Sequence, residues 1–264
     1  MDLQLDNKRA LVSGSTAGIG YAIAEALARE GAHVIVNGRT EVRVEAALAK
    51  LKGAGVKGQV EGLAADLGTR DGVEQMIAKY PDADILVNNL GIFEVKAFEQ
   101  IPDDDWFRFF EVNVMSGVRL SRHYLPRMKH GGWGRIVFIS SESALQIPKE
   151  MIHYGMTKTA QLAIARGLAE TTAGTNVTVN SVLAGPTKSE GVDTFIQQMA
   201  AARKVGPAEV EQEFFRSARP SSLLQRFATV DEVAAMVAFV CSPVSSATNG
   251  AALRVDGGVV QAIV

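Results

Sequence analysis

The chain has 264 residues, 47% of them hydrophobic, and its 27 basic residues nearly balance its 29 acidic ones. This length and composition allow a substantial core and predict one α/β domain over residues 1–264. The near-even charge gives no overall attraction to nucleic acid or to an anionic membrane, so we expect a small soluble molecule as the partner.

The N-terminal segment 1–8 is short and polar, and no apolar stretch reaches membrane-spanning length. We therefore expect a cytoplasmic protein. The single cysteine, Cys241, excludes an intramolecular disulfide and is expected to be a small buried hydrophobe. His33, His123 and His130 lack carboxylate or cysteine companions at ligand spacing, which predicts no metal site.

Along the chain, short runs rich in β-branched residues alternate with longer amphipathic stretches, a pattern typical of βαβ units around a parallel sheet. We expect strands at residues 10–13, 33–37, 58–64, 85–88, 135–140, 176–182 and 251–255. Helical periodicity is clearest at residues 19–30, 42–51, 73–79, 103–128, 153–171 and 231–240. Seven strands with helices between them predict a doubly wound Rossmann sheet with helices on both faces. In such a sheet, ligands bind at the carboxyl ends of the strands.

The first predicted strand is followed at once by Gly14-Ser15-Thr16-Ala17-Gly18-Ile19-Gly20, within which a helix begins. Glycines allow a sharp turn and a close approach to a pyrophosphate, whose charge is favoured at a helix N-terminus. A tight turn that only packs the helix on the strand would explain one or two glycines, but not readily three. This segment is therefore a candidate cofactor-binding turn.

No acidic residue stands at the end of the second predicted strand, where Gly38 is followed by Arg39 and Thr40. A carboxylate at this point would bind ribose hydroxyls and repel a 2′-phosphate, whereas a guanidinium and a hydroxyl attract one. The sequence thus favours NADP(H) over NAD(H). A solvated surface charge is the alternative role for Arg39.

Residues 186–222 are polar, charged and small, with helical tendency and no predicted strand. The segment is longer than an ordinary connection, and we expect it to cover the substrate. A packed surface excursion is the alternative.

Tyr154 and Lys158 lie four residues apart at the start of a predicted helix and so share a face. At ~4 Å and an effective dielectric of about 20, the lysine charge is worth roughly 4 kcal/mol, enough to bring the phenol pKa toward neutrality. Ser141 follows the fifth predicted strand and is suited to hold a substrate oxygen beside the phenol. Asn113 places an amide within the long helix 103–128. Each residue taken singly has a structural explanation.

Together these positions resemble the short-chain dehydrogenase/reductase family from about Lys8 to Gly258. The glycine turn matches its cofactor turn, with Ser13 in place of the usual threonine. Asn88-Asn89-Leu90-Gly91 resembles the Asn-Asn-Ala-Gly signature of the family, with leucine for alanine. Ala184 departs from the Pro-Gly that usually follows the sixth strand.

The resemblance implies a catalytic tetrad of Asn113, Ser141, Tyr154 and Lys158. Tyr154 would act as general acid/base while hydride moves between nicotinamide and a carbonyl or alcohol carbon. Lys158 would lower the tyrosine pKa and bind the nicotinamide ribose, and Asn113 would support a proton-conducting water. The implied cofactor contacts are Gly14, Ser15, Thr16, Gly18, Ile19, Gly20, Arg39, Thr40, Asp66, Leu67, Asn88, Gly91, Tyr154, Lys158, Gly185, Thr187 and Ser189.

The resemblance also implies a homotetramer or homodimer. Two other functions remain open: a 3-oxoacyl thioester reductase, and a non-catalytic NADP(H)-binding sensor, which would have no need of the tetrad. His153 points about 100° away from Tyr154 around the helix, so we expect a helix-start or surface role for it. We expect core or helix contacts from the aromatic residues Phe93, Trp106, Phe107, Phe109 and Phe110, with Phe93 also able to line the pocket.

Overall fold

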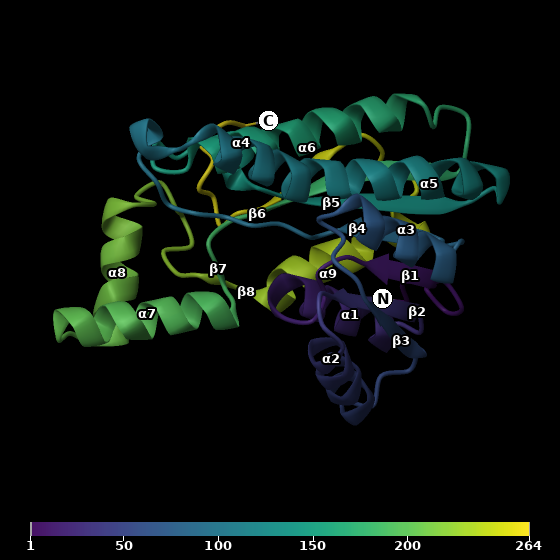
Figure 1. Ribbon diagram of the computed structural model, residues 1–264, viewed down its shortest axis with the longest axis horizontal. Helices are drawn as coiled ribbons and strands as arrows, with labels where there is room; N and C mark the ends of the chain where they lie inside the picture. The colour runs from purple at the N-terminus through teal and green to yellow at the C-terminus, as the bar shows by residue number, and fades with distance from the viewer. Residues whose placement is uncertain (1, 264) are drawn as a thin grey trace.

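The computed structural model describes residues 2–263 and places a parallel sheet between two layers of helices (Figure 1). The strand order is β3-β2-β1-β4-β5-β6-β9, so the order reverses between β1 and β4. The strands are β1 (Arg9–Val12), β2 (His33–Gly38), β3 (Val60–Ala64), β4 (Ile85–Asn88), β5 (Gly134–Ser141), β6 (Val177–Ala184) and β9 (Ala252–Val255). The predicted doubly wound Rossmann sheet is confirmed.

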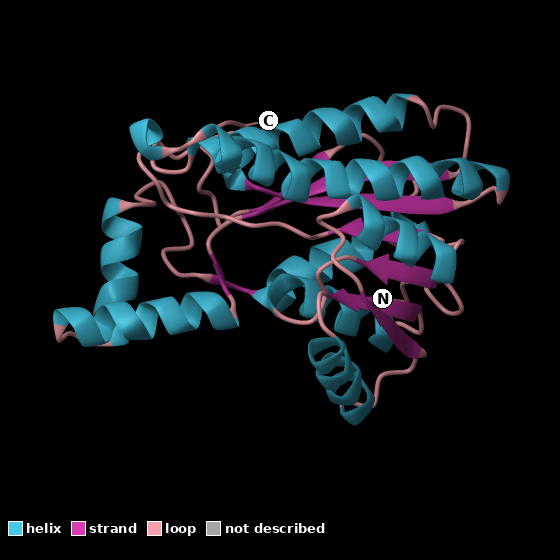
Figure 2. Ribbon diagram, viewed as in Figure 1, coloured by secondary structure: helices cyan, strands magenta, loops and turns pink. Residues whose placement is uncertain are grey.

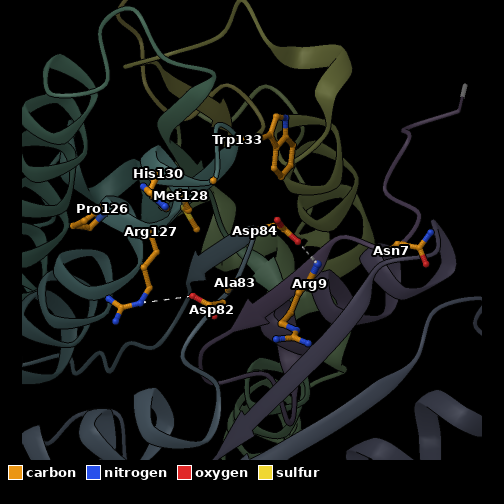
Figure 3. A pocket seen from close by; sticks show the side chains of 11 residues that line it. Asn7, Arg9, Asp82, Ala83, Asp84, Pro126, Arg127, Met128, His130 and Trp133 are labelled. Carbon is orange, nitrogen blue, oxygen red and sulfur yellow. Dashed lines mark hydrogen bonds and ion pairs between the residues drawn. The ribbon is translucent and has the colours of Figure 1, made fainter.

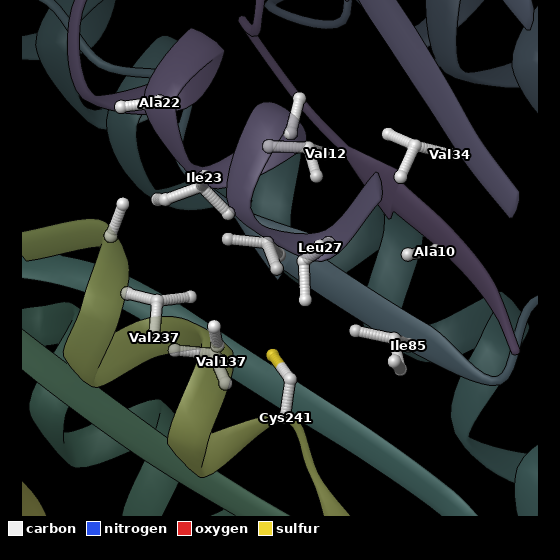
Figure 4. Packing of buried hydrophobic residues seen from close by; sticks show 14 of the residues in the cluster. Ala10, Val12, Ala22, Ile23, Leu27, Val34, Ile85, Val137, Val237 and Cys241 are labelled. Carbon is white, nitrogen blue, oxygen red and sulfur yellow. The ribbon is translucent and has the colours of Figure 1, made fainter. Parts of the chain in front are cut away.

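Alternate residues of the central strands pack against different helical layers. Ala10 and Val12 of β1 belong to the cluster formed with α1 (Gly18–Arg29), α2 (Glu41–Gly53) and α9 (Val230–Val240) (Figure 4). Leu11, between them, packs with α3 (Arg70–Lys79), α5 (Ser116–His130) and α6 (Ile152–Glu170) on the other face. Because both faces are buried, these strands consist of continuous apolar runs.

Cys241 lies in the first of these clusters, together with Val137, Val237 and Ile85 (Figure 4). Burial raises the pKa of its thiol to about 12, so the sulfur remains protonated. The expected role of Cys241 as a small core residue is confirmed.

The long helix expected over residues 103–128 is interrupted. It forms α4 (Asp103–Phe110), a π-helical turn η2 (Glu111–Met115) and then α5. The apolar periodicity continues through the wide turn, which explains why the sequence indicated one helix.

Residues 186–222 were expected to lack strands, and this expectation is wrong. Thr187–Lys188 forms β7, which pairs with β8 (Ala228–Thr229) beyond the segment. The helices α7 (Glu190–Arg203) and α8 (Pro207–Ser217) follow and extend away from the sheet (Figures 1 and 2). They bury a small apolar cluster of their own, Ile196, Ala200, Val210 and Phe215 with Phe227.

The remaining short elements are the 3-10 turns η1 (Phe98–Gln100), η3 (Glu142–Ala144) and η4 (Pro243–Ser245). Over residues 2–263, no helix is both long enough and apolar enough to cross a bilayer.

Candidate active site

The glycine turn between β1 and α1 lies at the switch point of the sheet, beside the end of β4. Gly14 and Gly18 have φ angles of +62° and +56°, which favour glycine. A Cβ on Gly20 would lie 2.4 Å from the Gly14 carbonyl oxygen. The turn therefore requires these three glycines, and its open backbone suits a pyrophosphate.

Two residues outside the predicted site hold this turn in place. Asn89 Nδ2 donates to the carbonyl oxygens of Ser13 and Gly14, each at 3.0 Å. The Gly14 amide donates to Asn37 Oδ1 at 3.1 Å. Ser13, which replaces the threonine usual in the resembled family, accepts from the backbone amides of Asn89 and Leu90 at 2.9 and 3.0 Å. The hydroxyl group is thus what this position requires.

A cavity of about 200 Å³ opens beside the turn and suits the adenosine end of a dinucleotide. Arg39 lies in its wall with a second arginine, Arg43 of α2. Sequence reasoning missed Arg43, although it is only four residues beyond Arg39. The other lining residues are Gly14, Thr16, Ala17, Asn37, Gly38, Ala65, Asp66, Leu67 and Leu90. Gly38 must be small, since a Cβ there would lie 2.5 Å from Thr16 Cγ2. The residues present therefore fit a dinucleotide.

Two of the expected cofactor contacts have side chains that bond within the protein, and a third lies outside the cavity lining. The buried Ser15 hydroxyl donates to Val12 O at 2.7 Å and accepts from the Asn37 amide, so it links β1 to β2. Asn88 turns its side chain toward α5, where Nδ2 donates to Ser121 Oγ at 3.2 Å. Thr40 is exposed at the start of α2 and lies outside the lining of the adenosine cavity. Among the residues of the asparagine signature, it is Asn89 whose side chain holds the glycine turn.

The loop after β6 reaches the same edge of the sheet. Gly185 packs against the Asp256 backbone, where a Cβ would lie 2.6 Å from Asp256 Cα. Thr187 Oγ1 donates to Gly185 O at 2.9 Å. Ser189 caps α7, and its Cβ lies 3.6 Å from the Cβ position of Gly18. The start of residues 186–222 therefore lies against the glycine turn.

The structure brings Ser141 and Tyr154 together. Ser141 is the last residue of β5 rather than the residue after the strand, and it caps η3 by accepting from Ser143 N at 3.1 Å. Burial, and next the Glu142 carboxylate, raise the pKa of Tyr154, whereas a hydrogen bond with Ser141 lowers it. The net direction is upward, opposite to the expected effect of Lys158. The phenol is therefore protonated at neutral pH.

Lys158 is buried on the same side of α6 as Tyr154. Its Nζ lies 5.6 Å from the centre of the Tyr154 ring and donates to Ile139 O at 2.9 Å. Burial lowers the pKa of this ammonium to about 8. The amine thus lies beside the phenol ring, and its protonated form is disfavoured by loss of solvent.

Asn113 lies in η2, and its side chain bonds to the Ile92 backbone in both directions, at 2.7 and 2.9 Å. The backbone carbonyl oxygen of Asn113 accepts from Gln161 Nε2 at 2.6 Å. Gln161 Oε1 in turn accepts from Lys158 Nζ at 3.3 Å. The buried Gln161 amide therefore links Asn113 to Lys158 by direct hydrogen bonds. Sequence reasoning missed Gln161, although a polar side chain one turn beyond Lys158 in an apolar stretch is a detectable signal.

Sequence reasoning also missed a pair of residues beside Ser141, namely Glu142 and Arg219. The Ser141 hydroxyl donates to Glu142 Oε2, and Glu142 Oε1 accepts from Arg219 Nε at 3.0 Å. Arg219 comes from the end of residues 186–222 and also lies 3.7 Å from Glu150. Glu142 was detectable as an acid directly after an apolar strand, but nothing in the sequence indicated Arg219.

The aromatic residues divide between core and surface. Phe93 is 68% exposed and meets the Tyr154 ring edge-on at 6.4 Å. His153 is fully buried, 4.1 Å from the Phe109 ring centre, and burial lowers its pKa. It lies at the start of α6, one of the two expected roles, but the alternative surface role is wrong, because this turn of α6 packs against α4. Phe107 and Phe110 are exposed, contrary to the expected core or helix contact.

A cavity of about 630 Å³ lies at the other end of the strands, where β1, β4 and β5 begin (Figure 3). Its walls include Arg9 at the start of β1 and Trp133, which precedes β5. Asp84 accepts from the Arg9 amide at 2.8 Å, and Arg127 lies 3.6 Å from Asp82. Since ligands of doubly wound sheets bind at the carboxyl ends of the strands, this cavity is separate from the candidate active site.

A glycine turn at a sheet switch point, together with a serine, a tyrosine and a buried lysine, defines the class of Rossmann-fold oxidoreductases. The family described as Enoyl-(Acyl carrier protein) reductase matches residues 14–260. The chain is 51% identical over 263 residues to the uncharacterized oxidoreductase YvaG of Bacillus subtilis (strain 168), covering 100% of both chains. It is 34% identical to the D-beta-hydroxybutyrate dehydrogenase of Cupriavidus necator, covering 96% of this chain and 98% of that protein.

Among solved structures, L-sorbose reductase from Gluconobacter frateurii, complexed with NADPH and L-sorbose, matches with a TM-score of 0.92. It shares 30% sequence identity, and the match covers 100% of both chains. The chain therefore belongs to the short-chain dehydrogenase/reductase family. The resemblance stated from its motifs is confirmed, and the protein is an oxidoreductase of that family.

Proposed function

We propose that the protein is an NADP(H)-dependent oxidoreductase that interconverts a small carbonyl compound and its alcohol, with Tyr154 as the proton-transferring group. The observation that carries this proposal is the clustering of Ser141, Tyr154 and Lys158 at the carboxyl edge of the sheet. A sensor would have no need of this cluster.

NADP(H), when bound, would supply or accept the hydride at its nicotinamide ring. Gly14, Gly18 and Gly20 would hold its pyrophosphate, and Arg39 with Arg43 would hold a 2′-phosphate. Arg39 directly after β2 and Arg43 on α2 both line the cavity, whose lining holds no acid except Asp66, and this favours the phosphorylated cofactor. NAD(H) is the alternative cofactor.

Tyr154 would give its proton to the substrate oxygen while Ser141 donates a hydrogen bond to the same atom. The raised phenol pKa supports this role, because the phenol keeps its proton at neutral pH. The receiving oxygen becomes an alkoxide, which is a far stronger base than a phenolate, so the transfer remains favourable. Lys158, fixed by Ile139 O, would bind the cofactor ribose.

The test is NADPH consumption, followed by near-ultraviolet absorbance, with a panel of ketones and aldehydes. We expect Tyr154→Phe to lower kcat on the order of a thousandfold, because the phenyl ring cannot transfer a proton. Tyr80→Phe is the matched control, since the Tyr80 hydroxyl bonds to Glu61 at 3.1 Å and lies outside the cluster. Turnover that survives in Tyr154→Phe would contradict the proposal.

A further inference from the structure

Glu142 is a buried carboxylate that the proposed proton transfer does not use. Only 4% of the residue is exposed, and it lies directly after Ser141 in the chain. One carboxylate oxygen accepts from Ser141 Oγ and the other from Arg219 Nε. Both oxygens are therefore occupied, and one of the two partners is the serine of the candidate active site.

The hydrogen bonds of Ser141 place a condition on substrate binding. A serine hydroxyl has one hydrogen, and here Ser141 gives it to Glu142. Its oxygen also accepts from Ser143 N, and the Tyr154 hydroxyl lies within hydrogen-bond reach of it. To donate to a substrate carbonyl, Ser141 must withdraw its hydrogen from Glu142, and a buried carboxylate oxygen then loses its donor, which is unfavourable.

We propose that Glu142 selects carbonyl substrates that carry a hydroxyl group on the carbon next to the carbonyl. The substrate hydroxyl donates to Glu142 Oε2 in place of Ser141, and the freed Ser141 hydrogen bonds to the carbonyl oxygen. Oxygens on adjacent carbons lie within hydrogen-bond distance of each other, as do Ser141 Oγ and Glu142 Oε2. This inference rests on the proposed function and narrows its substrate class.

The surrounding charges favour a neutral substrate. Glu142 and Glu150 both face Arg219, so two carboxylates meet one guanidinium. Arg219 Nη1 also donates to Ala218 O at 2.8 Å. The guanidinium is therefore engaged by protein groups, and a substrate carboxylate in place of the hydroxyl would lie directly against the Glu142 carboxylate. Hydroxyketones and ketoses fit better than 2-keto acids.

In the reaction, hydride would pass from NADPH to the carbonyl carbon and the Tyr154 proton to the carbonyl oxygen. The hydride brings two electrons with one hydrogen, and Tyr154 brings the second hydrogen as a proton. The products are a vicinal diol, NADP⁺ and a Tyr154 phenolate, which takes a proton back from water. The adjacent hydroxyl is unchanged and serves only in binding.

The first test uses the unaltered protein and matched substrates in which methyl replaces hydroxyl. These are hydroxyacetone against butanone, and 2-hydroxycyclohexanone against 2-methylcyclohexanone, with pyruvate as the anionic comparison. We expect kcat/KM for each hydroxyketone to exceed that of its partner by at least about tenfold, the order expected for one buried hydrogen bond. Pyruvate should be the poorest substrate.

Glu142→Gln tests the residue itself. Arg219 holds the amide oxygen, so the amide nitrogen faces Ser141 and an acceptor is replaced by a donor. The ratio of hydroxyketone to ketone should fall to near one. Glu150→Gln is the matched control, because Glu150 also meets Arg219 but does not contact Ser141, and its ratio should stay as in the unaltered protein.

The outcomes separate this inference from the proposed function. Tyr154-dependent reduction with equal kcat/KM for both members of each pair, or with pyruvate preferred, overturns the role of Glu142 and leaves the proposed function intact. An unchanged ratio in Glu142→Gln does the same. Absence of any Tyr154-dependent reduction across the whole carbonyl panel overturns both.

Discussion

The turn after β1 and the cluster at the end of β5 lie at the same edge of the sheet but are built differently. The turn consists of backbone, and three glycines make room for a ligand. The cluster consists of side chains, among them a buried lysine and a buried glutamate. The first site depends on shape, whereas the second depends on charges kept from water, so substitutions at the two sites should differ in their pH dependence.

The largest effect that distinguishes them should come from Lys158→Met. Burial lowers the lysine pKa from 10.5 to about 8, so between these pH values the unfolded chain binds a proton that the folded chain lacks. The free energy of unfolding of the unaltered protein should therefore rise with pH across this window, relative to the variant, by up to roughly 3 kcal/mol. Urea unfolding at several pH values measures this difference, and parallel curves would refute it.

Gly20→Ala should affect the turn without any pH dependence. The new Cβ would lie 2.4 Å from both Gly14 O and Asn89 Nδ2, so the turn must shift. We expect NADPH to bind about fiftyfold more weakly, on the order of 2 kcal/mol, in a fluorescence titration. Gly53→Ala is the control, because a Cβ there meets nothing within 4 Å. Equal affinities in the two variants would show that the turn is not a close-approach site.

Gln161→Leu probes the link between the π-helical turn and the lysine. The change removes the donor to Asn113 O and an acceptor of Lys158, so we expect about 2 kcal/mol lower stability. The stability window assigned to Lys158 should also begin at a lower pH, since one acceptor of its ammonium is lost. Loss of stability without movement of this window would indicate a packing role alone.

Arg39→Gln should give the smallest effect. Arg39 is exposed, and its neighbour Arg43 keeps positive charge in the same cavity. We expect about a tenfold loss of the ratio of NADPH to NADH in kcat/KM, roughly 1.4 kcal/mol, and a smaller loss at high salt. Arg203→Gln, an exposed change on α7, should leave the ratio unaltered.

The same contrast explains how much of the molecule the sequence predicts. The sheet, its seven strands and the glycine turn follow from short-range patterns, because apolar runs and glycine spacing act locally. The pairing of Glu142 with Arg219 joins residues 77 apart, which no local pattern reveals. The bridge from Asn113 through Gln161 depends on an irregular turn that leaves the hydrophobic period intact. Nor does the motif reveal that the Ser15 hydroxyl bonds internally to Val12 O, and the cofactor contact implied for Ser15 stays a prediction.

The π-helical turn at Glu111–Met115 also bears on how this region tolerates insertions and deletions. A π turn accommodates one residue more than the corresponding α-helical stretch. Removing one residue there would let the helix run in regular register from α4 into α5. The shortened protein would have a more regular helix, and the backbone carbonyl of Asn113 would no longer be left free by the wide turn to accept from Gln161.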